Sequence, residues 1–340
     1  MENKPKIIVT GGAGFIGSHT VLELIDSGYL PVIIDDFSNS KEWIIERLCT
    51  LTNSAIMYYN VDCKNYETLH EIFTGLGEIE GIIHFAAFKS VNESVEFPIK
   101  YCHNNIGSLT TVLKLTEEFG IPKLVFSSSC TIYGQADELP VTELTPMKRA
   151  ASPYGHTKQV GENLITLIKK EGAVILRYFN PIGAHPSGLI GELPNGSPNN
   201  LIPYITQTAI GIREELKVFG NDYNTSDGTC LRDYIHVVDL AKAHVKALMY
   251  LDEHRKTNTF NIGTGKAHSV LQMVNTFEEV NQKKLNYKIV PRRAGDVEKI
   301  YADTTKANNI LKWKAKYGIK EALRDAWKWE LNIQGMRLSA

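Results

Sequence analysis

The stretch that decides the fold is TGGAGFIG, at residues 10–17. It stands between a short β-branched run and an amphipathic run at residues 18–27, so it occupies a strand-to-helix turn. Gly11, Gly14 and Gly17 are spaced so that one forms the tight turn, one lets the backbone approach a pyrophosphate, and one lets strand and helix pack closely. The start of the helix offers free N–H groups and a positive dipole end. This segment therefore predicts a site for the diphosphate of a dinucleotide.

The first half of the chain repeats a pattern of strand followed by helix. Val21, Leu22 and Ile25 share one face of the helix after the glycine segment, and Gly28 is expected to end it. The predicted strands are nearly continuous in Ile, Val and Leu, as is typical of strands covered on both faces. They are expected at residues 6–10, 31–35, 56–61, 81–85, 123–127 and 173–177. This alternation predicts an α/β fold with a doubly wound, parallel, Rossmann-like sheet.

The pattern changes in the second half of the chain. Two segments rich in polar and turn-forming residues, at 183–198 and 221–229, are predicted to be loops. Helices are predicted at residues 237–250, 270–280 and 320–331. We expect a nucleotide-binding domain at residues 1–185 and a smaller mixed α/β domain at residues 186–340, with the chain returning to the first domain near residues 234–265.

An acidic pair ends the second predicted strand. Asp35 and Asp36 come 18 and 19 residues after Gly17, and a carboxylate about 20 residues after such a turn accepts hydrogen bonds from the ribose hydroxyls. That carboxylate would repel a 2′-phosphate, and residues 35–40 contain no arginine, which favours NAD over NADP. The alternative is a glycine-rich turn beside an unrelated acidic pair, and the combination of strand, helix and acid disfavours it.

Other predicted strands end in side chains suited to a cofactor, at the edge where open parallel sheets bind ligands. Asp62 and Cys63 follow the third strand, where a carboxylate can reach the adenine amino group. Phe85, Ala86 and Ala87 end the fourth, and the small alanines allow close approach. Each of these is an ordinary packing pattern when taken singly.

Tyr154 and Lys158 lie four residues apart at the start of a predicted helix, so they share a helical face. An ammonium group near a phenol lowers the tyrosine pKa, which makes Tyr154 a candidate general base for a sugar or alcohol hydroxyl. Ser129 ends the serine run after the fifth strand and can donate to the reacting oxygen, while Asn104 can order the site. The alternatives are a solvated Tyr–Lys pair, a serine-rich turn and a helix-surface asparagine.

The composition excludes several classes of protein. The 340 residues include 37 Lys and Arg against 38 Asp and Glu, so no basic excess exists for binding nucleic acid. The five cysteines are scattered without a C-x-x-C pair, which disfavours a disulfide framework, and we expect no metal site. No run reaches the ~18 apolar residues of a membrane span, and the first residues lack a signal-peptide core, so we expect a cytoplasmic protein.

Six motifs resemble those of the UDP-glucose (UDP-galactose) 4-epimerases, of the extended short-chain dehydrogenase/reductase superfamily. They are TGGAGFIGSH at 10–19, HFAAFKSVNESV at 84–95, FSSSCTIYG at 126–134, YGHTK at 154–158, RYFNPIGAHPSG at 177–188 and RDYIHVVDLA at 232–241. The first and fourth mark only the superfamily, and the combination of the third, fifth and sixth is more specific. The likeness, from about residue 6 to 329, implies bound NAD and the interconversion of UDP-galactose and UDP-glucose by transient oxidation at sugar C4.

The resemblance also implies which residues form the site. The cofactor contacts would be Gly11, Gly14, Phe15, Ile16, Gly17, Asp35, Asp36, Phe37, Ser38, Asn39, Ser40, Asp62, Cys63, Phe85, Ala86, Ala87, Lys89, Asn104, Tyr154, Lys158 and Phe179. The catalytic residues would be Ser129, Tyr154 and Lys158. The UDP-sugar contacts would be Lys89, Ser129, Tyr154, Asn180, Asn200, Leu201, Phe219, Arg232, Arg293, Asp296 and Ile300. Arg232 and Arg293 suit a diphosphate because they donate forked, charge-assisted hydrogen bonds. Their alternative role is a surface ion pair with Asp233 or Asp296.

Ile300 departs from the family pattern at a position that resembles its sugar-pocket gate. A large tyrosine there is associated with plain hexoses, and a small Cys or Ser with N-acetylated sugars as well. Isoleucine is intermediate in size and stiff at χ1, so acceptance of UDP-GlcNAc and UDP-GalNAc stays open, and Ile300 could equally be an ordinary core residue. The resemblance further implies a homodimer through helices near residues 99–118 and 154–170, whose apolar faces could instead be core.

Two rival functions remain. Another NAD-dependent sugar-nucleotide enzyme, a 4,6-dehydratase or a decarboxylase, would keep Tyr154 and Lys158 but need further acid–base groups. Ser129 is followed by Cys130, Thr131 and an isoleucine, with no carboxylate, which counts against a dehydratase. A non-catalytic NAD-binding module could dispense with the tyrosine and the lysine, and fold alone never decides between these functions.

Overall fold

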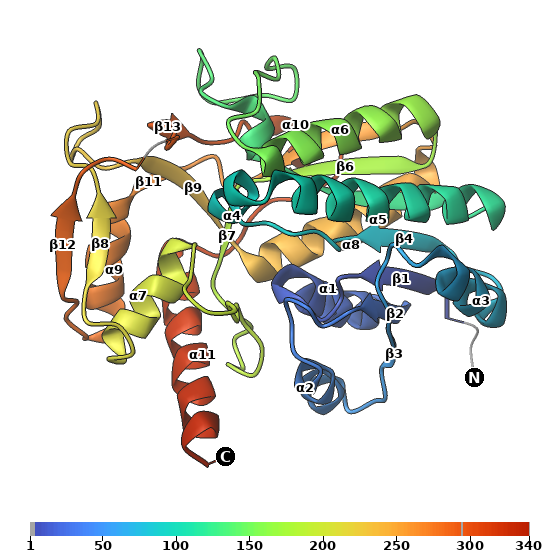
Figure 1. Cartoon of the computed structure of the whole chain (residues 1–340), viewed down its shortest axis with the longest axis horizontal. Helices are drawn as coiled ribbons and strands as arrows, with labels where there is room; N and C mark the ends of the chain where they lie inside the picture. Colours follow the sequence, from blue (N-terminus) through green and yellow to red (C-terminus); the bar gives the residue numbers. More distant parts are fainter. Residues whose placement is uncertain (1–3, 294, 340) are drawn as a thin grey trace.

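The computed structural model describes residues 4–293 and 295–339, and it has two parts (Figure 1). The larger part is a seven-stranded sheet in the order β10-β6-β5-β4-β1-β2-β3, in which all neighbours run parallel. Its strands are β1 (Lys6–Thr10), β2 (Leu30–Asp35), β3 (Met57–Asn60), β4 (Gly81–His84), β5 (Lys123–Ser129), β6 (Ala173–Tyr178) and β10 (Asn258–Ile262). The strand order reverses between β1 and β4, the point at which a doubly wound sheet binds its ligand.

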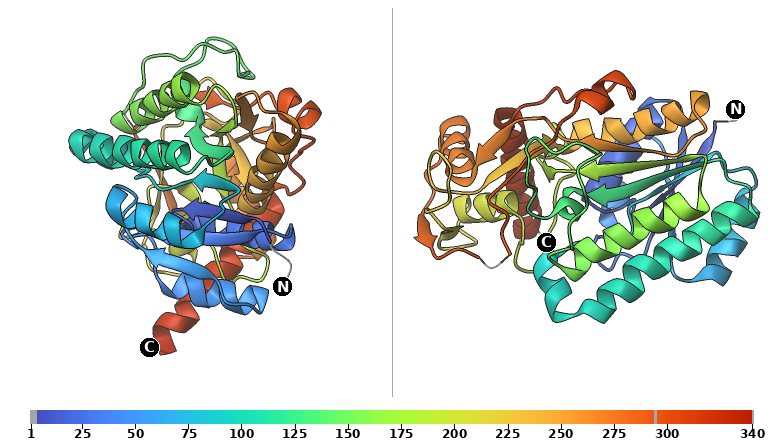
Figure 2. Two further views of the ribbon diagram at one scale, coloured as in Figure 1. Left: turned by 90° about the vertical axis from the view of Figure 1, so that its right-hand side faces the viewer. Right: turned by 90° about the horizontal axis from the view of Figure 1, so that it is seen from above.

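Two layers of helices cover this sheet, one on each face (Figure 2). One layer consists of α1 (Phe15–Asp26), α2 (Trp43–Thr52) and α8 (Val237–Glu253), and the other of α3 (Tyr66–Leu76), α5 (Pro98–Glu118) and α6 (Pro153–Ile168). Ile7 and Val9 of β1 enter the first core and Ile8 enters the second. Because both faces are covered, these strands read as unbroken apolar runs. The six predicted strands are confirmed to within two residues at each end.

Helix α1 begins earlier than predicted. It starts at Phe15 rather than at residue 18, because Gly14 already has the extended backbone of an N-cap residue. Its end is as predicted: the last helical residue is Asp26, and Gly28 has a φ of +88°, which an L side chain rarely adopts. The glycine turn is therefore short, and the first N–H groups of α1 lie directly beside it.

The smaller part is built from short strands and three helices around its own core. Its strands are β7 (Asn180–Ile182), β8 (Leu216–Phe219), β9 (Leu231–His236), β11 (Ala267–Ser269), β12 (Tyr287–Val290) and β13 (Lys299–Ile300). Its helices are α7 (Leu201–Ala209), α9 (Val270–Asn281) and α11 (Ile319–Ser339). The remaining short helices are α4 (Val91–Glu96), the 3₁₀ helix η1 (Cys130–Tyr133) and α10 (Thr305–Asn309). The helices predicted in the second half of the chain are confirmed as α8, α9 and α11.

The chain passes between the two parts more than once. After β9, helix α8 packs on the large sheet and β10 pairs with β6 at its edge. Helix α11 joins the two cores, with Leu323 in the smaller one and Trp329 and Ile333 in the larger one. The division at residues 185 and 186 stays a prediction.

Candidate active site

A cavity of about 1180 Å³ lies between the two parts, at the carboxyl ends of β1, β2, β4 and β5. It is lined by all of the predicted site residues except Phe37. The Phe37 side chain packs against the larger core and lies edge-on to Tyr58, and its left-handed backbone (φ +53°) turns the chain there. Phe37 is therefore a corner residue of the loop after β2, and its role as a cofactor contact stays a prediction.

The glycine turn is shaped by backbone contacts that no side chain could share. A Cβ on Gly17 would lie 2.2 Å from the carbonyl oxygen of Gly11, and Gly11 itself has a φ of +68°. Helix α1 begins without a side-chain cap, so its first N–H groups remain available on the cavity wall. An uncapped helix start beside a side-chain-free turn fits the pyrophosphate of a dinucleotide.

Asp35 is buried, and most acceptor positions of its carboxylate are already hydrogen-bonded within the protein. Its carboxylate accepts hydrogen bonds from the N–H of Ala13 (2.9 Å), the N–H of Phe37 (3.0 Å) and the hydroxyl of Ser40 (2.8 Å), and burial raises its pKa. A carboxylate has about four acceptor positions, so about one is left for a ribose hydroxyl. Asp35 thus also ties the loop after β2 to the glycine turn, which the sequence prediction missed. Asp36 is exposed and binds Ser38.

Asp62 and Asn104 are joined through a residue that the sequence analysis overlooked. Lys64 forms an ion pair with Asp62 (3.0 Å) and donates a hydrogen bond to the Oδ1 atom of Asn104 (3.2 Å). Both partners line the cavity. The position of Lys64, two residues after Asp62, could have predicted the ion pair. No local pattern indicated that Lys64 would also reach Asn104 on α5.

Tyr154 and Lys158 are brought to the cavity by the start of α6. Ser152 caps this helix by accepting a hydrogen bond from the N–H of Gly155 (3.1 Å), and Pro153 occupies the first turn. The Nζ atom of Lys158 donates to the carbonyl oxygen of Ser127 (2.6 Å) and lies 5.9 Å from the centre of the Tyr154 ring. Helix start and strand end together place the predicted base and its lysine at one wall.

The pKa values in this site differ from the sequence prediction. Burial lowers the pKa of Lys158 from 10.5 to about 7, opposed by the charge of Glu162. Burial also raises the pKa of Tyr154 to about 12, opposed by a hydrogen bond with Ser129. The expectation that the lysine lowers the tyrosine pKa was therefore wrong for the ligand-free protein. The physical reason is that removal from water is the largest cause of both shifts, and neither group is among the causes of the other's shift.

Two arginines face one carboxylate on the other side of the cavity. Arg293 binds Asp296 through Nη2 (2.7 Å) and Nε (3.2 Å), and Arg232 approaches the same carboxylate at 4.0 Å. The Asp233 carboxylate, in contrast, accepts hydrogen bonds from the N–H and hydroxyl of Thr264 and from the N–H of Gly265. The predicted alternative of an ion pair with Asp296 is present, yet two guanidinium groups against one carboxylate leave an excess positive charge that suits a diphosphate.

Aromatic and apolar side chains complete this side of the cavity. The Phe219 ring is exposed beside Arg293, at 5.5 Å from its guanidinium, and offers a flat surface for a base. Ile300 is 5% exposed and packs with Phe179 and Val141, yet it also lines the cavity. Ile300 is thus both a core residue and a wall residue. Asn180, Asn200 and Leu201 lie at the starts of β7 and α7.

A residue missed by the sequence analysis links the two sets of predicted contacts. Oε1 of Glu192 accepts hydrogen bonds from Nζ of Lys89 (2.7 Å) and Nδ2 of Asn200 (2.6 Å). The same loop bonds to the larger part twice more, from Asn195 to the carbonyl of Ser38 (3.0 Å) and from Asn199 to the Ser90 hydroxyl (3.1 Å). The sequence predicted a loop at residues 183–198, but it did not predict these hydrogen bonds.

Among residues 4–293 and 295–339, no group of three or more His, Cys, Asp or Glu side chains is arranged to hold a metal ion. In that same part of the chain, no helix is long and apolar enough to cross a membrane. All five cysteines are free thiols.

Comparison with known proteins gives consistent matches. The family model described as GDP-mannose 4,6 dehydratase matches residues 8–326. A UDP-glucose 4-epimerase of Dictyostelium discoideum is 49% identical over 336 residues, covering 97% of each protein. The solved UDP-glucose-4-epimerase of Stenotrophomonas maltophila, with bound NAD and formylated UDP-arabinopyranose, has a TM-score of 0.95 and 42% identity, covering 99% of this chain and 100% of that one. The corresponding structure from Bifidobacterium longum, in complex with NAD+ and UDP, has a TM-score of 0.91 and 40% identity, with 96% and 98% coverage.

Proposed function

The chain belongs to the UDP-glucose 4-epimerase family, of the short-chain dehydrogenase/reductase type, and on this premise we propose that it interconverts UDP-galactose and UDP-glucose with NAD as its cofactor. The observation that carries the proposal is the cavity of about 1180 Å³ between the two parts. It is lined by the glycine turn, by Ser129 and Tyr154, and by Arg232 and Arg293.

The residues present fit NAD. The uncapped start of α1 and the glycine turn would hold the pyrophosphate, and Asp35 has an acceptor position left for the ribose. When bound, NAD supplies the acceptor for a hydride from sugar C4 and the donor that returns it to either face of the 4-ketone. The remaining predicted cofactor contacts other than Phe37 also line the cavity.

Tyr154 would act as the base. Its phenolate takes the proton of the sugar 4-hydroxyl and later returns it, while the Ser129 hydroxyl orients the same oxygen. The raised pKa of Tyr154 means that a nearby positive charge must favour the phenolate, and protonated Lys158 and a cationic nicotinamide ring are the groups able to provide one. Ligand binding is therefore expected to lower the pKa of Tyr154 towards working pH and to raise the pKa of Lys158 above it.

Arg232 and Arg293 would hold the diphosphate while the sugar turns. In the described part of the chain both guanidinium groups approach the Asp296 carboxylate, so a ligand phosphate would supply a further negative charge. Holding the UDP end firmly and the sugar loosely lets both faces of C4 be presented in one site. Ile300 leaves the pocket intermediate in size, and UDP-GlcNAc and UDP-GalNAc are further candidate substrates on that ground.

The rival functions have less support. A 4,6-dehydratase needs a carboxylate beside the active-site serine, and the hydroxyl and N–H of Thr131 bind Ser129 instead. The relative from Dictyostelium discoideum carries the epimerase name, although the matching family model carries that of a dehydratase. A non-catalytic NAD-binding module would have no use for Tyr154, Lys158 and two arginines in one cavity.

The test is to incubate the purified protein with UDP-galactose and no added cofactor, and to identify the product sugar. UDP-glucose is expected, and Tyr154→Phe should lower kcat by about 10² to 10⁴ while retaining NAD. A 4-keto-6-deoxy sugar as product would indicate a dehydratase. Retained NAD without any turnover by the wild-type protein would favour the non-catalytic module.

A homodimer through α5 and α6 is part of the proposal. These helices form the outer layer on their side of the sheet (Figure 2), and the apolar side chains of Ile99, Leu167 and Ile168 are 78%, 73% and 48% exposed on them. Apolar surface of this kind favours association. Sedimentation velocity should give twice the mass of the chain, and a sedimenting monomer at micromolar concentration would contradict the dimer.

A cytoplasmic location is proposed as well. Five unpaired thiols in one chain suit a reducing compartment, where disulfides do not form. Cell fractionation with detection of the chain tests this, and recovery in a membrane or secreted fraction would contradict it.

A further inference from the structure

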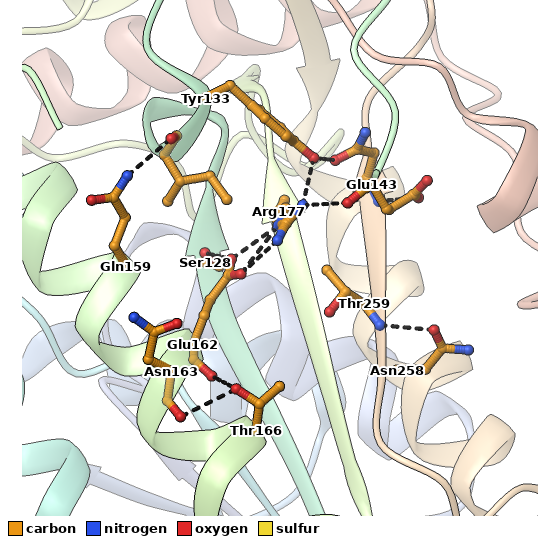
Figure 3. A network of polar contacts seen from close by, with 12 residues as sticks. Ser128, Tyr133, Glu143, Gln159, Glu162, Asn163, Thr166, Arg177, Asn258 and Thr259 are labelled. Carbon is orange, nitrogen blue, oxygen red and sulfur yellow. Dashed lines mark hydrogen bonds and ion pairs between the residues drawn. The ribbon is translucent and has the colours of Figure 1, made fainter. Parts of the chain in front are cut away.

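A buried polar network runs from α6, which carries Tyr154 and Lys158, to Tyr133 (Figure 3). Further hydrogen bonds join Tyr133 to the segment that carries Ile300. The centre of the network is Arg177 on β6. The guanidinium binds the carboxylate of Glu162 through Nη2 (2.7 Å) and Nε (3.0 Å), and the two side chains are 6% and 4% exposed. Two sets of hydrogen bonds lead away from this pair, here called the helix arm and the pocket arm.

The helix arm runs from Glu162 to the end of β5. Glu162 is four residues after Lys158 and eight after Tyr154 on α6, and its carboxylate accepts a hydrogen bond from the Ser128 hydroxyl. The neighbours of Ser128 are Ser129, which lines the cavity, and Ser127, whose carbonyl accepts from Lys158. One carboxylate thus ties the helix of the base to the strand of the serine.

The pocket arm runs from Arg177 to the segment that follows Ile300. Nη1 of Arg177 donates to the Tyr133 oxygen (2.9 Å), and the Tyr133 hydroxyl donates to Oδ1 of Asn261 on β10 (2.6 Å). Nδ2 of Asn261 donates to the carbonyl of Val141 (2.9 Å), and the N–H of Val141 donates to the carbonyl of Tyr301 (3.0 Å). Tyr301 directly follows Ile300.

The chemistry of the pair favours a positioning role over a stabilising one. Burying two charges costs desolvation energy, and well-packed apolar residues often replace a buried ion pair without loss of stability. What such a pair retains is directionality, because each N–H and each oxygen needs a partner at a defined place. Arg177 donates to α6 on one side, and on the other to Tyr133 and to the carbonyl of Glu143 (3.1 Å).

We propose that Arg177, with Glu162 and Tyr133, is a positioning device that sets the distance between the Tyr154 hydroxyl and the sugar pocket at Ile300. This inference rests on the proposed epimerase function. The three residues lie outside the cavity lining and are not catalytic residues. They act through the backbone of α6 and of the segment after β13, so their removal should affect turnover of the sugar rather than binding of the UDP portion.

Tyr133→Phe tests the pocket arm, because it removes only the hydroxyl oxygen that binds both Arg177 and Asn261. Tyr250→Phe is the matched control, because the Tyr250 oxygen also binds an asparagine of β10, accepting from Asn258 (3.0 Å), but has no link to Arg177. We expect Tyr133→Phe to lower kcat for UDP-galactose by about tenfold or more, since small misplacements of reacting groups are costly. The Kd for UDP should stay within about twofold of wild type, and Tyr250→Phe should change neither quantity.

The melting temperatures of both variants show whether a fall in kcat comes from misplaced groups or from a less stable fold. If Tyr133→Phe does not fold, Ser128→Ala interrupts the helix arm and should produce the same fall in kcat with unchanged UDP binding. Equal kcat in wild type, Tyr133→Phe and Tyr250→Phe would overturn the inference while leaving the proposed function intact. A parallel loss of kcat, UDP affinity and melting temperature would also overturn it, since that is a structural role. An inactive wild-type protein would overturn the proposed function and the inference with it.

Discussion

At the scale of single residues, burial decides the charge of the proposed catalytic groups. Lys158 is 5% exposed, and its described hydrogen-bond acceptors are a carbonyl and a hydroxyl oxygen of Ser127 rather than a carboxylate. An ammonium group without a directly bound counter-charge loses its hydration on folding, which explains the fall in its pKa to about 7. Burial among neutral oxygens therefore decides whether Lys158 carries its charge.

The lowered pKa of Lys158 predicts a specific pH dependence of stability. Between pH 7 and about 10 the unfolded chain keeps the proton that the folded chain has lost, so the free energy of unfolding should rise with pH in that window. Below pH 7 the cost of the buried charge is fully present. Lys158→Met should remove this rise, as measured by urea denaturation of NAD-free protein from pH 6 to 10.

The difference between wild type and Lys158→Met is the quantity to plot, because the other titrating groups cancel in it. We expect this difference to favour the variant at pH 6 and to shrink towards pH 10. Two curves that stay parallel across the range would contradict a lowered lysine pKa.

Ile300 carries the second prediction at this scale. Its side chain belongs to the buried cluster that contains Phe179 and Val141 and also lines the cavity, so a larger side chain there is expected to extend into the sugar pocket. Ile300→Tyr is expected to abolish turnover of UDP-GalNAc, if wild type shows any, and to spare UDP-galactose. Assays of both substrates on both proteins measure this. Equal loss of the two activities would mean that Ile300 is needed for packing rather than for selection.

At the scale of elements, the glycine turn between β1 and α1 depends on close backbone contacts. Gly17 packs so closely against Gly11 that a methyl group on Gly17 would overlap the carbonyl oxygen of Gly11. The turn and the start of α1 therefore form one unit, held to the end of β2 by the N–H of Gly11 bonded to Ile34 (2.7 Å). A change here should act on cofactor binding and on the fold together.

Gly17→Ala tests this unit. Its Cβ would lie 2.2 Å from the Gly11 oxygen, so the turn must open, and we expect loss of bound NAD with a lower melting temperature. Gly75→Ala is the control, since nothing lies within 4 Å of the added methyl group in α3, and it should raise stability by about 0.5–1 kcal/mol. Retention of NAD by Gly17→Ala, measured by absorbance after gel filtration, would contradict the proposed pyrophosphate site.

At the scale of the whole molecule, the loop at residues 192–200 connects the two parts across the cavity. Its bonds to Ser38, Lys89 and Ser90 come from three different side chains, and each reaches a loop of the nucleotide-binding part. Trp329 of α11 fixes the beginning of this loop by donating to the carbonyl of Glu192 (2.9 Å). The loop is thus placed to slow the escape of a bound cofactor.

The double variant Asn195→Ala, Asn199→Ala removes two of these bonds and leaves Glu192 in place. NAD should leave at least about threefold faster, because each exposed hydrogen bond contributes about 0.5–1.5 kcal/mol. Added NAD should restore activity. Asn286→Ala is the control, since that side chain also donates to a carbonyl, that of Glu214 (2.7 Å), away from the cavity. Unchanged NAD release from the double variant would show that the loop does not retain the cofactor.

Local patterns determined much of this protein. Three patterns, each contained within about 30 residues, predicted the sheet, the edge at which it binds its ligand, and NAD as the cofactor. They are the glycine spacing, the position of Asp35 after the glycine turn, and the apolar runs of the strands. The motif resemblance brought in the remaining site residues, nearly all of which line the cavity.

Contacts distant in sequence were decided by the tertiary structure alone. Lys89 meets Glu192 across 103 positions, and Tyr133 meets Asn261 across 128, and no local pattern marks such pairs. The pKa values of Tyr154 and Lys158 belong to the same class, because they depend on how much water packing removes. Propensity and periodicity act between near neighbours, whereas burial and partner choice are properties of the packed molecule.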